Sequence, residues 1–137
     1  MVRLYLDANV ILDYLQDREN APYIEKIFVK ANNQEVQLLT SVINFATIFY
    51  FESRVGQSTS RIIERFKILN IIINPVSQTV ASYYSSLKSG FNDFEDALQY
   101  FAAVESESDY ILTNNIKDFK SSKIPVLTAK DYVQKIF

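Results

Sequence analysis

Short apolar runs alternate with helical patterns along the whole of this 137-residue chain. The apolar runs predict strands at 2–6, 36–40, 70–74, 110–113 and 124–127. Apolar residues recur between them at helical spacing, and only two Gly and three Pro interrupt the pattern. Strands that alternate with helices usually form a parallel sheet with helices on both faces. We therefore predict one domain over residues 1–137, an α/β fold with three layers (α/β/α) and a central, mainly parallel sheet.

Local signals mark where the predicted helices begin. Pro22 suits the first turn of a helix, and four further positions carry residues that favour helix caps, namely Ser41, Ser77, Asn92 or Asp93, and Thr128. Gly90 stands where a left-handed residue would end the helix that starts after Ser77.

Two of these segments carry expectations about burial. The continuous apolar run 70–74 predicts a strand that is buried on both faces. The apolar face that follows, with Tyr83, Tyr84, Leu87 and Phe91, is expected to pack in the core, with a dimer contact as the alternative.

The chain contains no His and no Cys. This absence excludes Ser-His-Asp triads, Cys nucleophiles and the usual zinc sites, so any catalysis depends on carboxylates, hydroxyls, Lys or Arg, with a metal ion as helper. The net charge of −2 argues against a protein that coats nucleic acid without specificity. No stretch approaches the ~20 apolar residues of a membrane helix, and no signal pattern opens the chain. We expect an intracellular, cytoplasmic protein without a membrane partner.

Aspartates follow the predicted strands and open one predicted helix. Asp7 comes directly after strand 2–6, Asp118 follows strand 110–113, and Asp93 and Asp96 stand at a helix start. Ligands of parallel sheets bind beyond the carboxyl ends of the strands, where these side chains would meet. Clustered carboxylates raise one another's pKa unless a cation neutralises them, and Mg²⁺ or Mn²⁺ prefers oxygen ligands. The sequence predicts an acidic metal pocket.

Each aspartate also has a purely structural interpretation. Asp7 suits the cap of the following helix, Asp93 and Asp96 suit a negatively charged first turn, and Asp118 suits a solvated turn. Local sequence leaves these alternatives open.

The spaced set of motifs resembles the PIN domain. The resemblance rests on Leu6-Asp7-Ala8-Asn9-Val10-Ile11-Leu12, Asp93-Phe94-Glu95-Asp96-Ala97-Leu98, and Ile111-Leu112-Thr113-Asn114-Asn115 with Asp118-Phe119. It covers essentially the whole chain and is greatest with the bacterial branch that includes VapC-type toxin ribonucleases. It implies a metal-dependent endoribonuclease that is often dimeric and often neutralised by a small antitoxin protein.

The resemblance also implies roles for individual residues. Asp7 would be the first metal carboxylate, supported by Asn9. Asp96, assisted by Asp93, would be the main downstream ligand for Mg²⁺ or Mn²⁺.

The chain departs from the family pattern at two positions. Thr113 and Asn115 match a turn where many relatives have a Thr and an acid, so Asn115 is neutral where an acid is usual, and Asp118 would supply the missing charge. Thr47 stands where many relatives carry a metal-binding Glu, and Asn44, one turn earlier, would partly substitute for it. The remaining acids would suffice for one metal ion.

Three functions remain open from the sequence. The leading hypothesis is an RNA-cleaving, VapC-like homodimer with an antitoxin partner, in which Lys117 and Lys120 contact RNA phosphates. The alternative is a catalytically weakened PIN module that binds RNA or a protein partner. A phosphotransfer enzyme with Asp7 as nucleophile is the third; the haloacid-dehalogenase type would have an acid two residues on, where this chain has Asn9.

Overall fold

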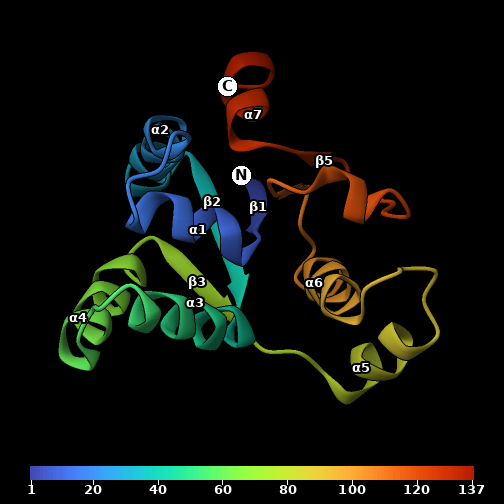
Figure 1. Ribbon diagram of the computed structural model, residues 1–137. Coiled ribbons are helices and arrows are strands. Elements are labelled where there is room, and N and C mark those ends of the chain that lie inside the picture. Colours follow the sequence, from blue (N-terminus) through green and yellow to red (C-terminus); the bar gives the residue numbers. More distant parts are fainter.

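The computed structural model describes residues 1–137, in which five strands alternate with seven α-helices and one 3-10 helix (Figure 1). The strands are β1 (Val2–Leu6), β2 (Val36–Ser41), β3 (Ile73–Val76), β4 (Tyr110–Leu112) and β5 (Val126–Leu127). The helices are α1 (Ala8–Leu15), α2 (Ala21–Asn32), α3 (Val42–Arg54), α4 (Thr59–Leu69), α5 (Val80–Leu87), α6 (Phe94–Glu105), the 3-10 helix η1 (Ile116–Phe119) and α7 (Ala129–Lys135). No helix is long and apolar enough to cross a membrane.

The strands form one parallel sheet in the order β3-β2-β1-β4-β5. Side chains of a strand alternate between the two faces, and the core divides accordingly. Leu4 and Leu6 belong to a cluster with α1, α2 and α7, whereas Tyr5 between them packs with Tyr100 of α6 on the other face. The predicted α/β fold with helices on both faces of a parallel sheet is confirmed.

Several helix starts follow the predicted caps. Ser41, Asp93 and Thr128 each accept a hydrogen bond from the backbone N–H three residues on. For α5 the prediction was wrong, because Thr79 rather than Ser77 is the N-cap. Gly90 also lacks the expected left-handed conformation, and the one glycine with positive φ is Gly56, at +94°.

The strand expected at 70–74 begins three residues later, at Ile73, and it is not buried on both faces. β3 is an edge strand, since it pairs only with β2, and Ile71 before it is 76% exposed. Pro75 lies inside β3, which an edge strand tolerates because it lacks a second neighbour that needs the missing N–H. The apolar run 70–74 therefore combines a turn with the start of an edge strand.

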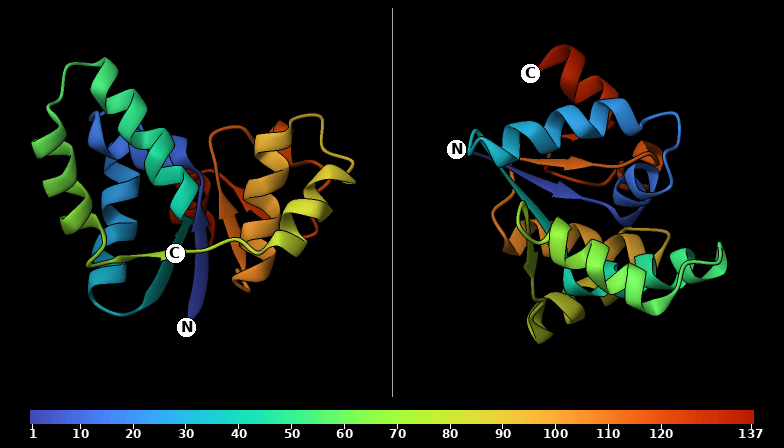
Figure 2. Two further views of the ribbon diagram at one scale, coloured as in Figure 1. Left: turned by 90° about the horizontal axis from the view of Figure 1, so that it is seen from below. Right: turned by 90° about the vertical axis from the view of Figure 1, so that its left-hand side faces the viewer.

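Helix α5 turns its apolar face away from the core. Ser82 and Ser86 are its buried residues, whereas Tyr83, Tyr84 and Leu87 are exposed. α5 packs beside α6 at one margin of the molecule (Figure 2). The expectation that this face is core was wrong for the three residues of α5, because small hydroxyl side chains make the close contact instead. Phe91, after the helix, does pack against a core cluster, as expected.

Candidate metal centre

Asp7 lies at the carboxyl end of β1, and its side chain is almost enclosed (8% exposed). It occupies the N-cap position of α1, yet its carboxylate makes no capping hydrogen bond. Its Oδ2 instead accepts hydrogen bonds from Thr113 Oγ1 at 2.8 Å and from Asn9 Nδ2 at 3.2 Å. Helix capping therefore does not account for this buried carboxylate.

A polar hollow of about 270 Å³ brings Asp7 together with the other three predicted aspartates. Asp93 and Asp96 reach it from the start of α6, and Asp118 reaches it from η1. Asp93 also caps α6, since its Oδ1 accepts a hydrogen bond from the Asp96 backbone N–H at 3.1 Å. Such a cap contributes ~1 kcal/mol. Asp93 thus has a structural role and a place in the hollow.

Glu95 lines the same hollow and was not expected there. Its place in the first turn of α6, directly before Asp96, was the available signal. The hollow therefore holds five carboxylates from three parts of the chain.

The carboxylates affect one another's protonation. Burial raises the pKa of Asp96 to about 7, and the negative charges of Asp93, Asp118, Asp7 and Glu95 add to the rise. Burial also raises the pKa of the Asp7 carboxyl above its ordinary value, against the lowering effect of its hydrogen bond from Thr113. A cation in the hollow would relieve both effects.

The residues of the hollow fit one hard divalent cation. No three carboxylates in the structure lie close enough together to hold one metal ion among them. Mg²⁺ does not require such a cage, because it usually keeps several waters and binds through one or two carboxylates. Asp7 and Asp96 are the pair whose raised pKa values most favour a cation, so they are the candidate ligands.

Thr47 lines the hollow from α3, at the position that the resemblance associates with a Glu. Glu52, five residues on, points elsewhere: it is 1% exposed and pairs with Arg65 Nη1 at 3.5 Å. No carboxylate of α3 therefore joins the site.

Asn44 does not line the hollow. It is fully buried, and its Nδ2 donates to Thr40 Oγ1 and to Gln99 Oε1, each at 2.8 Å. The expected substitution of Asn44 for an acid is not supported, since its amide is engaged in the interior.

Thr113 and Asn115 form the turn beside Asp7. Thr113 is fully buried, donates its hydroxyl proton to Asp7 and accepts a hydrogen bond from the Asn115 backbone N–H at 3.1 Å. Asn115 also lines the hollow. The turn therefore orients the Asp7 carboxylate.

Lys117 and Lys120 line a second hollow of about 250 Å³. This hollow adjoins the first, because Asp93, Asp96 and Asp118 line both. Two basic side chains thus lie next to the acidic pocket, where the sequence predicted phosphate contacts.

These features define an α/β protein with an acidic pocket at the carboxyl edge of its parallel sheet. The family model of the PIN domain matches residues 3–117. The chain belongs to the PIN domain family. A comparison with curated protein sequences gives no match.

Solved structures of toxin–antitoxin proteins share the fold. VapBC2 from Rickettsia felis, bound to a promoter DNA fragment, matches with a TM-score of 0.69 and 16% identity, over 93% of this chain and 98% of the other. VapBC-1 from nontypeable Haemophilus influenzae matches with a TM-score of 0.67 and 16% identity, over 94% and 99%. Mycobacterium tuberculosis VapC20, a sarcin–ricin loop cleaving toxin, matches with a TM-score of 0.61 and 8% identity, over 79% and 86%.

Proposed function

We propose that this protein is a metal-dependent endoribonuclease of the VapC toxin type that acts in the cytoplasm. The observation that carries the proposal is the hollow in which Asp7 and Asp96, both with raised pKa, face Asp93, Glu95 and Asp118. The similarity of the fold to that of VapC20, described as a toxin that cleaves the sarcin–ricin loop, supports RNA as the substrate class.

The chain's own residues supply binding and orientation. Asp7 and Asp96 would hold Mg²⁺ or Mn²⁺, which would supply activation of water and neutralisation of charge on the phosphodiester. Asp93 fixes the start of α6, and Asp118 adds negative charge. Lys117 and Lys120 contact RNA phosphates beside the hollow.

A cleavage assay tests the proposal. Purified protein is incubated with structured RNA in Mn²⁺, Mg²⁺ or EDTA, beside Asp96→Asn, which keeps the side-chain shape but removes the charge. We expect metal-dependent cleavage that falls by at least about a hundredfold in Asp96→Asn. Cleavage that persists in EDTA or in the folded variant would contradict the proposal.

The second candidate is a catalytically weakened PIN module. Thr47 and Asn115, which line the hollow without charge, motivate it. Thr47→Glu places a carboxylate on the wall of the hollow and distinguishes a weakened module from an active nuclease. If wild type binds RNA without cleaving it and Thr47→Glu cleaves it, the weakened module is correct.

An antitoxin partner is the second part of the proposal. An apolar groove of about 510 Å³ lies between α2 and α4, with the exposed side chains Val29, Ile68 and Ile71 along it. Exposed apolar surface of this kind marks contact sites. The structural neighbours include toxin–antitoxin complexes, so an antitoxin segment is the occupant that we assign to this groove.

A homodimer is the third part of the proposal. Val80, Tyr83, Tyr84 and Leu87 repeat at helical spacing on the exposed face of α5, and Phe94 of α6 lies 6.0 Å from the ring of Tyr83. α5 has no charged residue, so two copies of this face meet without like-charge repulsion.

A further inference from the structure

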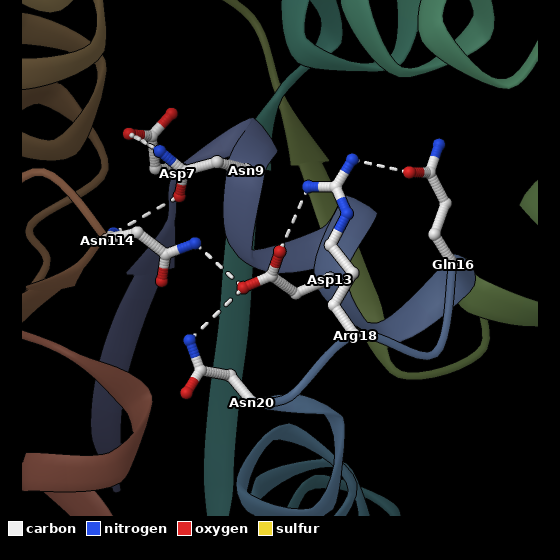
Figure 3. A network of polar contacts seen from close by, with 7 residues as sticks. All are labelled: Asp7, Asn9, Asp13, Gln16, Arg18, Asn20 and Asn114. Carbon is white, nitrogen blue, oxygen red and sulfur yellow. Dashed lines mark hydrogen bonds and ion pairs between the residues drawn. The ribbon is translucent and has the colours of Figure 1, made fainter.

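Asp13 is a buried carboxylate that lies outside the acidic hollow. It is on α1, is 4% exposed and accepts hydrogen bonds from three side chains (Figure 3). Arg18 Nη1 binds its Oδ1 at 3.1 Å, and Asn20 Nδ2 and Asn114 Nδ2 bind its Oδ2 at 3.3 and 2.7 Å. Removing a carboxylate from water is unfavourable without such partners.

The shortest of these bonds connects Asp13 to the turn after β4. The backbone N–H of Asn114 donates to Asn9 Oδ1 at 3.2 Å. Since the oxygen end of the Asn9 amide is held there, its Nδ2 points to Asp7 Oδ2, at 3.2 Å (Figure 3). A continuous path of hydrogen bonds thus leads from Asp13 through Asn114 and Asn9 to the Asp7 carboxylate.

We propose that Asp13 is a positioning residue for the metal centre: it holds Asn114 so that the Asn9 amide fixes the orientation of Asp7. The Arg18 and Asn20 contacts tie the loop between α1 and α2 to the same carboxylate. The contact with Asn114 is the one that reaches the site.

The proposal rests on the metal-binding function proposed above. It makes different predictions for the contact with Asn114 and for the contact with Arg18. Asp13→Ala and Asn114→Ala should each weaken Mn²⁺ binding by about tenfold, the lower end of the effect of partners that orient metal ligands. The double variant should bind Mn²⁺ no more weakly than either single variant, because both substitutions act through one path. Arg18→Gln, which leaves the contact with Asn114 in place, is the matched control and should bind Mn²⁺ as wild type does.

The experiment combines calorimetric Mn²⁺ titrations with NMR spectra of the metal-free protein. The side-chain amide of Asn9 should be protected from solvent exchange in wild type and Arg18→Gln, and lose protection in Asp13→Ala and Asn114→Ala. Asn114 is exposed, so its variant tests the path even if Asp13→Ala unfolds. Unchanged Asn9 protection in Asn114→Ala, or strictly additive affinity losses, would overturn the proposal. If wild type binds no Mn²⁺, the metal function fails, and the Asn9 signal alone decides the positioning role.

Discussion

At the scale of single residues, folding changes the ionisation of Asp96, because burial and neighbouring carboxylates raise its pKa. Its pKa is about 7 in the folded protein, against about 3.9 in an unfolded chain. The folded state therefore keeps a proton that the unfolded state releases between these values. The stability that this group contributes is fully present below about pH 4 and is lost as pH rises through 7.

We predict that the metal-free protein loses part of its free energy of unfolding between pH 4 and pH 7.5 because of Asp96. Asp96→Asn, which has no proton to lose, should lack this part of the slope, whereas Asp131→Asn, at the start of α7, should keep it. Denaturant unfolding at a series of pH values measures the difference. Parallel pH curves for wild type and Asp96→Asn would show that this carboxyl ionises normally.

The sequence predicts where a residue lies better than it predicts which side chains form hydrogen bonds with it. The four aspartates were expected to meet because each follows a strand or opens a helix, and they line one hollow. The buried network of Asn44 and the path through Asp13 were not expected. Both depend on contacts between residues up to 105 positions apart, such as Asn114 with Asn9, which no local pattern encodes.

At the scale of elements, strand and helix order followed from periodicity, but burial did not. The apolar run 70–74 and the apolar face of α5 both have the pattern of core segments. The run 70–74 lies at and before an edge strand, and α5 turns its apolar face outward. Periodicity shows that a face is apolar, while tertiary packing decides whether the same chain covers it.

We predict that the exposed face of α5 joins two copies of the chain. Tyr84 lies on this face and is 57% exposed. Tyr84→Glu would place a negative charge on each copy at the contact, and the repulsion between them should dissociate the dimer. Ser85→Glu adds the same charge to the same helix beside the apolar face, and it should leave the dimer intact. Sedimentation equilibrium measures both masses. A monomeric wild type, or equal dissociation by both variants, would rule out this interface.

At the scale of the whole molecule, the fold places five carboxylates around one hollow in a protein whose net charge is only −2. β1 and β4 are neighbours, so Asp7 and the Thr113 turn meet, and α6 presents its first turn to the same edge. The basic side chains Lys117 and Lys120 lie directly beside that charge. In the proposed function, the two lysines would contact the phosphates of a polyanionic substrate beside the carboxylates that would hold the cation.

The proposed activity requires that the acidic hollow binds a divalent metal ion. Crystals grown with Mn²⁺, with diffraction recorded at the manganese absorption edge, test it most directly. We predict an anomalous density peak in the hollow, bonded to carboxylate oxygens of Asp7 and Asp96, and no such peak in crystals of Asp7→Asn. A hollow without anomalous density at saturating Mn²⁺, or a peak bonded to neither aspartate, would show that Asp7 and Asp96 are not metal ligands.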